Sequence, residues 1–569
     1  MKRIRRWILA AADGVADRTG LSQEVCGPPC IAHLLQRRGF RTDAEAGDFL
    51  RPRLRNLRDP FLLPQMRLAV DRILKAIDLR EKIVLYGDYD VDGVTSLALL
   101  NEILIAYGTT PALFLPMRLE EGYGLSAEAI ERCWEAHRPS LLIAVDCGTS
   151  SCAEIADLCA RGADVIVLDH HEPKKELPDC IALVNPKAAP SSDFRYLCSV
   201  GVVFKLCHAL LKTRPLPNFD LRRRLDLVAL GTVADIVPLE GENRILVHHG
   251  AREIAAQRLL GMSQLLELAK VRPPIVAEHI GFRIGPRLNA AGRLTNAEKA
   301  LHLLLTTDST EARQLAAELD GQNRERQSLE REIARVAEEK IARKELGDAT
   351  AIVLGERGWH PGVLGIVASR IARSYHRPAI IIGFDDTGCG KGSGRSIEGF
   401  SLVGALANCG DLLEKFGGHE MAAGLTIREE NLAAFSAKFV EICGGLLSVE
   451  QLEPRLLLDA ELRLSDLNWT LLRWHELLQP FGQGNPQPLF LARNVEPTVA
   501  PQILKERHLV LRLRQNGRFQ RAIFFGGAEE PLPNPPWDVA FKIATDEYEG
   551  ELRLQMQVEA LRSATGMES

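Results

Sequence analysis

The chain has 569 residues, 46% of them hydrophobic and 25% charged, and a net charge of −5. This length exceeds what one hydrophobic core supports and predicts roughly three or four domains, and no apolar run approaches the roughly 20 residues of a membrane span. The small negative charge excludes a uniformly basic protein but permits a local basic groove, because electrostatic steering depends on how charge is distributed.

The 12 cysteines are scattered, and no two of them form a C-x-x-C pair. The closest two, Cys26 and Cys30, flank the sequence GPP. The N-terminal apolar stretch at 7–12 ends at Asp13, which is too short for the core of a secretory signal. We therefore expect reduced thiols in a cytoplasmic protein.

The first part of the chain shows two hydrophobic patterns. Apolar residues within 31–35 and 44–50 recur at helical spacing, which predicts a small helical segment over residues 1–60. The apolar runs 83–85, 141–145 and 165–168 then alternate with helical stretches such as 95–107, and the segment 227–230 continues this apolar pattern. Apolar strands separated by helices indicate a parallel sheet with helices on both faces.

The pattern changes twice more along the chain. Residues 306–346 are highly charged but carry an apolar stripe at helical spacing, which predicts one long helix. A second α/β unit follows, with strands near 351–354 and 379–382 and a closing helical stretch over 427–450. Beyond residue 453, polar and apolar residues alternate in several short segments separated by Gly, Pro and Asn turns. This pattern indicates the short strands of a small β-barrel.

Three aspartates, Asp88, Asp90 and Asp92, follow the first strand in the sequence YGDYDVDG. So many carboxylates cannot be buried together unless a positive group neutralises them, and the carboxyl ends of strands are where open α/β sheets place their sites. A solvated acidic loop or a calcium turn is the alternative. A calcium helix-loop-helix is disfavoured because a strand precedes this loop and the closing Glu is missing.

Later segments of the domain also end in potential ligands. Asp146 follows the second strand, His170 and His171 follow the third, and Asp235 follows the later apolar segment. Carboxylates with one or two imidazoles favour Mn²⁺ or Mg²⁺ over a thiolate-bound structural zinc, and so many acids predict two ions. A surface turn is the alternative for the His pair. The candidate catalytic residues are Asp88, Asp90, Asp92, Asp146, His170, His171 and Asp235, and all of them except His171 are also candidate metal ligands.

These segments resemble the four motifs of the DHH phosphoesterase superfamily. The motifs are DYDVDG (88–93), VDCG (145–148), DHH (169–171) and GTVAD (231–235). Over about residues 50–560 the chain is also similar to the RecJ family of single-strand-specific 5′ to 3′ exonucleases. The segments that carry this similarity are RLEEGYGL (118–125), GPRLNAAGR (285–293), WHPGVLGIVASR (359–370), GSGRS (392–396), GGHEMAAG (417–424) and PFGQGNP (480–486).

One position departs from the superfamily pattern. Members that act on small molecules begin the first motif with His-x-x-x-Asp-x-Asp, whereas this chain has Tyr86 in place of the histidine and Asp88 as an extra acid. Asp88 therefore either binds the metal directly or contacts the residues that do.

The resemblance implies the fold class and domain order. We expect an α/β protein with a parallel-sheet DHH domain and a smaller α/β DHHA1 domain joined by a long helix, plus a C-terminal OB-like β-barrel. The predicted boundaries are 1–60 for the helical segment, 61–300 for the DHH domain, 301–346 for the connecting helix, 347–452 for the DHHA1 domain and 453–569 for the barrel.

A second set of residues is predicted to bind phosphate. The segment KGSGRS (391–396) alternates glycine with hydrogen-bond donors, and in an open loop its N–H groups and Arg395 would bind an anion. A flexible surface loop is the alternative. The candidate phosphate-binding residues are Arg118, Arg287, Asn289, Arg293, His360, Arg370, Ser393, Arg395 and His419.

The C-terminal β unit resembles an OB-fold, which binds single strands through a basic groove and aromatic platforms. Phe519 or Phe524 is the predicted platform, and we expect at least one ring of the Phe524–Phe525 pair in the core. The candidate nucleic-acid-binding residues are Lys505, Arg507, His508 and Arg521.

The resemblance implies a single-stranded-DNA-specific 5′ to 3′ exonuclease that hydrolyses phosphodiester bonds with Mn²⁺ or Mg²⁺ in DNA recombination and repair. It implies single-stranded DNA with a 5′ end as substrate, a single-strand-binding protein and a helicase as partners, and no membrane; we expect a monomer. The alternatives are a nano-RNA or cyclic-dinucleotide phosphodiesterase, or a catalytically inactive replication scaffold. The residues alone encode neither polarity nor a preference for DNA over RNA.

Overall fold

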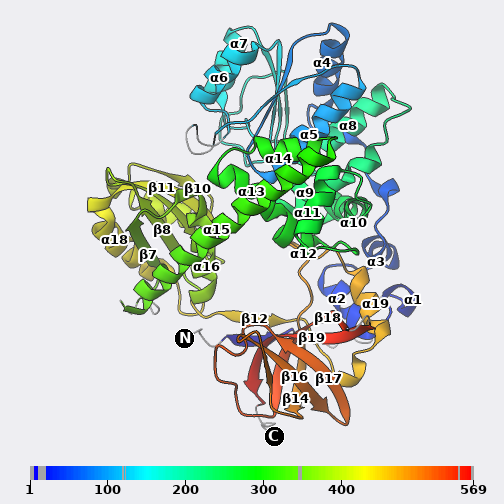
Figure 1. Ribbon diagram of the computed structural model, residues 1–569, viewed down its shortest axis with the longest axis vertical. Coiled ribbons are helices and arrows are strands. Elements are labelled where there is room, and N and C mark those ends of the chain that lie inside the picture. Colours follow the sequence, from blue (N-terminus) through cyan, green and yellow to red (C-terminus); the bar gives the residue numbers. More distant parts are fainter. Residues whose placement is uncertain are drawn as a thin grey trace. The chain divides into compact units, whose positions relative to one another are not determined.

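The computed structural model describes residues 5–10, 21–117, 121, 124–343, 346, 349–548 and 551–564. The chain forms two compact units (Figure 1). The first contains residues 58–237 and 249–454, and the second contains residues 6–57, 238–248 and 455–569. Among the helices of the described residues, none combines the length and the apolar character that a membrane span requires.

The first unit contains the predicted parallel sheet. Its five strands lie in the order β3-β2-β4-β5-β6 and are all parallel. Their interior positions are buried and apolar, as expected for a sheet covered on both faces. The strands are β2 (Ile83–Gly87), β3 (Ala112–Phe114), β4 (Leu141–Val145), β5 (Asp164–Leu168) and β6 (Ala182–Val184).

Helices cover both faces of this sheet (Figure 1). α6 (Ala127–His137) and α7 (Cys152–Ala160) share a hydrophobic core with one face of the sheet. α5 (Val91–Ala106) contacts β2, α8 (Ser199–Thr213) contacts β5, and these two helices pack on each other. The helix predicted over 95–107 begins earlier, at Val91, because the Asp90 side chain caps its N-terminus. α4 (Met66–Asp78) packs against α8 and β6.

The apolar segment 227–230, grouped with the strands in the sequence analysis, is helical instead. It lies within α9 (Leu225–Ala234), whose residues from 225 to 232 are all buried. A helix buried on every side has no amphipathic periodicity, so its sequence cannot be distinguished from a buried strand. The helices that follow are α10 (Gly241–Ala255), α11 (Leu260–Leu268), α12 (Ala277–His279), a π-helical segment (Ile280–Ile284), α13 (Gly285–Leu294) and α14 (Glu298–Leu305).

The long charged helix is present as α15 (Ser309–Arg343), with 35 residues. It contacts α11, α13 and α14, which follow the first sheet in the chain, as well as α16 (Pro361–Tyr375), which precedes β8 of the second sheet. Its buried residues, including Ala316, Leu319, Ile333 and Ala337, form the apolar stripe, while exposed positions carry ion pairs such as the i,i+4 pair of Arg335 with Glu339.

The second sheet is mixed and lies in the order β10-β11-β9-β8-β7. Only β7 and β8 are parallel; the other neighbours are antiparallel. The predicted closing helical stretch over 427–450 is shorter, because β11 continues to Arg428 and α18 begins at Leu432. The elements are β7 (Ile352–Arg357), β8 (Ala379–Phe384), β9 (Cys389–Arg395), α17 (Leu402–Ala407), β10 (Lys415–Gly418), β11 (Ala422–Arg428) and α18 (Leu432–Leu446).

The second unit contains the predicted barrel. Five strands close into a ring in the order β14-β18-β19-β17-β16, with β16 pairing back onto β14. Asn516 and Gly517 both have positive φ and form the two-residue hairpin between β16 and β17. The strands are β12 (Arg455–Leu458), β13 (Ala460–Glu461), β14 (Phe490–Pro497), β15 (Gln502–Leu504), β16 (His508–Gln515), β17 (Arg518–Phe524), β18 (Trp537–Tyr548) and β19 (Glu551–Ser563).

The N-terminal helices belong to this second unit. Leu34 and Leu35 share one core with Leu471 of α19 (Trp469–Leu477) and with the barrel strands. A strand that the sequence analysis did not predict, β1 (Arg6–Leu9), pairs in parallel with β12. The helices are α1 (Gln23–Cys26), α2 (Pro29–Arg37) and α3 (Asp43–Leu50). All twelve cysteines are free thiols, including Cys26 and Cys30.

Candidate metal centre and phosphate-binding site

The register of the first sheet brings the predicted acids to one edge. Gly87 is paired with Val145, and Val145 with Leu168, so three strands end at the same level. The residues that follow them are therefore neighbours: Asp88, Asp146 and Asp169 are each at most 2% exposed. Burial of three carboxylates at one edge is costly unless other groups compensate their charge.

Backbone geometry fixes the first motif. Asp90 Oδ1 accepts hydrogen bonds from the N–H groups of Asp92 at 2.8 Å and Gly93 at 3.2 Å and so starts α5. A Cβ at Gly93 would lie 2.4 Å from the carbonyl oxygen of Asp88, so the tight turn requires glycine. The Val91 N–H donates to Asn289 Oδ1 at 3.1 Å, which ties this loop to α13.

The N-terminus of α8 holds two of the acids. Asp92 accepts hydrogen bonds from the N–H groups of Ser199 at 2.7 Å and Val200 at 2.8 Å, one on each carboxylate oxygen. The Ser199 hydroxyl donates to Asp146 Oδ1 at 2.9 Å. No sequence signal points to this segment, because its first residues are neither acidic nor histidine and lie more than 100 residues from Asp92.

Asp146 has a left-handed backbone, with φ of 63°. Such a conformation costs a non-glycine residue about 1–2 kcal/mol and is common at functional sites. The Asp146 N–H donates to the carbonyl of Leu168 at 2.9 Å, which carries the sheet ladder past the end of β4 while the side chain turns toward the cluster.

His170 lies among the carboxylates. Its Nε2 atom is 3.4 Å from Asp235 Oδ2, 3.5 Å from Asp146 Oδ1 and 3.9 Å from Asp92 Oδ2. Burial, together with the neighbouring His171, lowers the pKa of His170 to about 3, so the ring is neutral at pH 7. Within the described residues, neither ring nitrogen of His170 makes a hydrogen bond. A buried neutral imidazole whose nitrogens make no hydrogen bond and which faces carboxylates is typical of a metal ligand.

Asp169 is the second group that the sequence analysis left out of the candidate list, although it directly precedes the two histidines. Its carboxylate accepts hydrogen bonds from the N–H of Thr149 at 3.0 Å and of His170 at 2.7 Å, and it contacts His171 Nδ1 at 2.7 Å. Burial alone would raise the pKa of Asp169, but these donors hold it below its usual value. Asp169 is therefore an ionised acceptor that fixes the orientation of the His171 ring.

All seven candidate catalytic side chains come together in the structure. Their ligand atoms form linked clusters, with all atoms in a cluster within 4.8 Å of one another. Asp146 belongs to two clusters and so joins them. The clusters are Asp88 with Asp90 and Asp146, Asp146 with His170 and His171, and Asp92 with Cys198 and Asp235.

The electrostatics of the clusters fit divalent cations. Burial and the neighbouring Asp90 raise the pKa of Asp92 to about 7, and burial and the neighbouring acids raise the pKa values of Asp146 and Asp235 well above their usual range. Mutual repulsion of this kind is relieved when a bound cation supplies positive charge. The oxygen-rich donor set with one imidazole suits Mn²⁺ or Mg²⁺.

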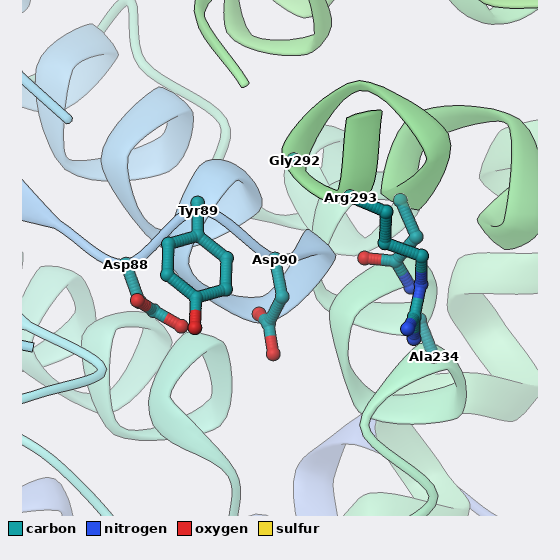
Figure 2. Close-up of a pocket in the computed structure, with 7 residues that line it drawn as sticks. Asp88, Tyr89, Asp90, Ala234, Gly292 and Arg293 are labelled. Carbon is teal, nitrogen blue, oxygen red and sulfur yellow. The ribbon is translucent and has the colours of Figure 1, made fainter. Parts of the chain in front are cut away.

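A cavity of about 280 Å³ lies beside the first motif. Figure 2 shows the carboxylates of Asp88 and Asp90 directed to the same side as the guanidinium of Arg293. Arg293 Nη1 donates to the carbonyl of Gly362 at 3.4 Å, so α13 contacts the start of α16 here. The cavity is lined by Asp88, Tyr89, Asp90, Ala234, Asn289, Gly292 and Arg293.

The prediction of a phosphate-binding loop at 391–396 is wrong in its local structure, because most of this segment forms strand β9. β9 pairs with β8 and β11, so its N–H groups belong to a sheet. A Cβ at Gly390, Gly392 or Gly394 would lie within 2.8 Å of a neighbouring side-chain atom. The alternating glycines therefore let the sheet pack closely, while the residues between them occupy the other face.

The alternate residues of β9 lie beneath α16. Arg395 Nη1 donates to Ser393 Oγ at 3.1 Å, and a Cβ on Gly365 of α16 would lie 3.0 Å from Arg395 Nη2. His360 precedes α16, and its Nδ1 accepts a hydrogen bond from the Gly362 N–H at 3.1 Å. The guanidinium of Arg395 and the hydroxyl of Ser393 thus lie beside α16, whose N-terminus is itself favourable for an anion.

The remaining predicted phosphate ligands are placed differently. Arg287 donates to Asp320 of α15 at 2.9 Å, and Arg370 donates to Glu338 of the same helix at 3.2 Å. His419 is exposed at the end of β10. Arg118, together with the neighbouring Tyr123, lies outside the described residues.

Tyr86 does not take the place of a metal-binding histidine. Its side chain is fully buried, and its hydroxyl donates to the carbonyl of Gly124 at 2.9 Å. Asp88 instead lies within one of the acidic clusters.

In the barrel, the predicted nucleic-acid-binding residues lie on and next to β16 and β17. Arg507 pairs with Glu529 at 2.7 Å and Arg521 with Asp546 at 3.1 Å. His508 Nδ1 accepts a hydrogen bond from the Gly526 N–H at 3.0 Å, and Lys505 is exposed in the turn before β16.

The phenylalanines of this region differ in how far they are buried. Phe524 packs against the barrel core, as predicted for one ring of the Phe524–Phe525 pair. Phe519 is 69% exposed and Phe525 53% exposed.

Three family models match the chain in the order of the folded regions. They are the DHH family N-terminal domain over residues 82–232, the DHHA1 domain over 348–445 and the RecJ OB domain over 458–560. A single-stranded-DNA-specific exonuclease RecJ from Dickeya dadantii is 36% identical over 562 residues, which cover 94% of this chain and 96% of the relative. The chain belongs to the RecJ family.

Other RecJ proteins support the same assignment. The RecJ exonuclease of Bacillus subtilis is 40% identical over 83% of this chain, and the match spans 60% of that protein. The crystal structure of RecJ in complex with Mn²⁺ from Thermus thermophilus has a TM-score of 0.84 and 34% identity, covering 99% of this chain and 80% of that one. The predicted RecJ resemblance and the fold class, with DHH, DHHA1 and OB-like barrel, are confirmed.

Proposed function

We propose that this chain is a metal-dependent exonuclease specific for single-stranded DNA. The observation that carries the proposal is His170, a buried neutral imidazole without hydrogen bonds among the described residues, directed at three carboxylates that the sheet edge and α8 bring together. Family membership supports the same activity, because the RecJ relatives are named single-stranded-DNA-specific exonucleases. The activity hydrolyses phosphodiester bonds.

The proposed metal-binding residues are six of the seven oxygen and imidazole donors of these clusters, with His171 left out. Two Mn²⁺ or Mg²⁺ ions there would activate water and stabilise the negative charge that develops on phosphorus. The structure of the relative with Mn²⁺ supports this choice of ion. The proposed ligands are Asp88, Asp90, Asp92, Asp146, His170 and Asp235.

The chain's own groups hold this arrangement and move protons. Ser199 and the N-terminus of α8 orient Asp146 and Asp92 by hydrogen bonds. Asp169 binds Nδ1 of His171, and we assign to Nε2 of this ring the donation of a proton to a phosphate oxygen. The hydrogen bond to Asp169 and the nearby acids raise the pKa of His171 against the effect of burial, which favours the protonated, donating form.

We assign phosphate binding to Arg293 and to the α16 region. Arg293 lines the cavity with Asp88 and Asp90 and also contacts Gly362, so it joins the acidic cluster to the start of α16. Arg395, Ser393 and the N-terminus of α16 would receive the next phosphates of the strand. Asn289 has a positioning role, because its amide oxygen is engaged by the first motif.

The barrel would bind a further part of the single-stranded DNA. Lys505, Arg507 and Arg521 supply positive charge, and the exposed ring of Phe519 offers a stacking surface for a base. A longer grip favours processive digestion.

The finer features of the activity are also proposals. We infer 5′ to 3′ polarity, a role in DNA recombination and repair, work as a monomer in the cytoplasm, and cooperation with a single-strand-binding protein and a helicase. The domain boundaries at residues 60, 300, 346 and 452 are proposed with them.

A direct comparison of substrates tests the proposed function. Single strands labelled at the 5′ or the 3′ end, duplexes and dinucleotides are incubated with the full chain and Mn²⁺. We expect mononucleotide release from the 5′ end of long single strands, with duplexes resistant. Faster turnover of dinucleotides would favour the nano-RNA or cyclic-dinucleotide phosphodiesterase, and no turnover of any substrate would favour the inactive scaffold.

A further inference from the structure

Cys198 is part of the candidate metal centre, although no sequence motif drew attention to it. It directly precedes α8 and is fully buried. Its Sγ atom and carboxylate oxygens of Asp92 and Asp235 all lie within 4.8 Å of one another. All twelve cysteines fall within the described residues, and Cys198 alone joins such a cluster.

A second, independent feature points into the same space. His170 Nε2 lies 3.4 Å from Asp235 and 3.9 Å from Asp92, the two carboxylates that Cys198 also approaches. The His170 side chain is 7% exposed, and across the described residues neither of its nitrogens has a hydrogen-bond partner. Two carboxylates, one imidazole and one thiol therefore converge.

We propose that Cys198 is a conditional sulfur ligand, which borderline or soft divalent cations such as Zn²⁺, Co²⁺ and Cd²⁺ recruit and which Mg²⁺ and Mn²⁺ leave as a thiol. The inference rests on the proposed function in one respect, since it requires that this centre binds metal. It adds a selectivity that the carboxylate and imidazole ligands do not provide on their own.

The reason is the difference in ligand softness. Hard Mg²⁺ and Mn²⁺ gain little from sulfur over oxygen, whereas thiolates are preferred ligands of zinc and of softer ions. Recruitment of Cys198 forms one sulfur–metal bond and releases the thiol proton to the solvent. Until then the thiol is held by its contact with Thr232 Oγ1, at 3.5 Å.

Sulfur recruitment would change how the enzyme responds to metals. A soft ion held by Asp92, Cys198, Asp235 and His170 would occupy ligands that the activating ions need. Zn²⁺ and Cd²⁺ would therefore inhibit in competition with Mn²⁺, and removal of the sulfur would weaken the inhibition by about 10–100-fold.

The test uses Co²⁺ as the probe, because a thiolate–Co²⁺ bond produces a near-ultraviolet charge-transfer band that oxygen and nitrogen ligands do not. The full-length protein and the variant Cys198→Ser are titrated with Co²⁺ and followed by absorption. We expect the band in the native chain and its loss in Cys198→Ser. Matched controls are Cys207→Ser, a buried thiol further along α8, and Cys147→Ser, next to Asp146; both should retain the band.

The outcomes separate this proposal from the proposed function. Mn²⁺ binding, followed by electron paramagnetic resonance, should be equal in the native chain and in Cys198→Ser, which also shows that the variant is folded. If the native chain binds no Mn²⁺, the metal centre itself is refuted. If Mn²⁺ binds but the charge-transfer band is absent, persists in Cys198→Ser or disappears in Cys147→Ser, the role of Cys198 is refuted while the nuclease proposal stands.

Discussion

The carboxylate of Asp169 lies 2.7 Å from Nδ1 of His171. Because the pKa of Asp169 is lowered despite complete burial, the carboxylate is the acceptor and the histidine nitrogen is the donor. This contact fixes the orientation of the imidazole and assigns the proton to Nδ1.

Asp169→Asn is expected to lower kcat by about 10–100-fold with little change in KM, because the amide no longer fixes the proton on Nδ1. Steady-state kinetics on single-stranded DNA with Mn²⁺ measures kcat and KM separately. The matched control is Asp164→Asn at the start of β5, the strand that Asp169 follows; the Asp164 carboxylate pairs with Arg72. A variant that changes KM alone would contradict a role in orienting His171.

Asp146→Asn is expected to abolish hydrolysis and yet to raise the melting temperature of the metal-free protein. The substitution removes one of several buried, mutually repelling carboxylates, keeps an acceptor for the Ser199 hydroxyl, and places at φ of 63° a residue type that tolerates it.

Thermal unfolding in EDTA and in Mn²⁺ tests this pair of effects. Mn²⁺ at roughly a hundredfold excess over its Kd should stabilise the native chain by about 2.7 kcal/mol and the variant by less. Asp157→Asn, at an exposed ion pair with Arg161, is the control and should leave activity unchanged. A lower melting temperature for Asp146→Asn in EDTA would contradict the repulsion argument.

Arg395→Ala is expected to weaken substrate binding about tenfold and to reduce the dependence of binding on salt by about one phosphate contact, with a smaller effect on kcat. Equilibrium binding of an oligonucleotide in EDTA at several salt concentrations measures both quantities. Arg357→Ala is a matched control, because that guanidinium pairs with Glu429 on the surface of the same region. Equal salt slopes for the native chain and Arg395→Ala would remove Arg395 from the phosphate site.

Phe519→Ala is expected to lower affinity for single-stranded DNA by about 1–3 kcal/mol without loss of stability, because the ring is exposed and free to stack on a base. Fluorescence anisotropy with a labelled strand gives the affinity. Ile503→Ala removes a similarly exposed apolar side chain that has no aromatic face. Equal losses in both variants would indicate a general apolar contact in place of stacking.

The second unit should lose stability in acid because of His475. This residue is 3% exposed, its Nε2 has no hydrogen bond among the described residues, and burial lowers its pKa to about 4. The unfolded chain, with a pKa of about 6.5, therefore binds the proton first. The free energy of unfolding is unaffected above about pH 6.5 and falls by up to about 3 kcal/mol as the pH drops to about 4.

Urea unfolding of the native chain and of His475→Gln between pH 7 and 4 isolates this effect. The difference between the two free energies of unfolding should shrink or reverse as the pH falls, because only the native chain gains a proton at this position on unfolding. A constant difference across that range would show that His475 does not titrate in this way.

The predictions made from sequence succeeded where the signal is local. The acids and histidines at 88–92, 146 and 170–171 each follow a short apolar strand, and β-strand geometry alone places such residues at one sheet edge. The register of β2, β4 and β5 agrees with that expectation. The long charged helix, present as α15, is an equally local pattern.

Contacts between distant segments could not be derived in this way. Ser199 and Val200 hold Asp92 only because α8 begins at the sheet edge, and no property of those two residues predicts it. The N-terminal helices share a core with the barrel, some 420 residues away along the chain, which periodicity cannot reveal.

The glycines of 390–394 also show how far a local sequence pattern can predict structure. Their alternation with polar residues indicates small residues at every second position, but it does not distinguish an open anion-binding loop from a strand whose neighbours approach too closely for a Cβ. The sequence by itself thus determined which residue types gather at the candidate site and the order of the folded regions. Only the tertiary structure decided which backbone amides bind the carboxylates, which arginines are already paired, and that a thiol lies close to Asp92 and Asp235, because these depend on packing between segments far apart in the chain.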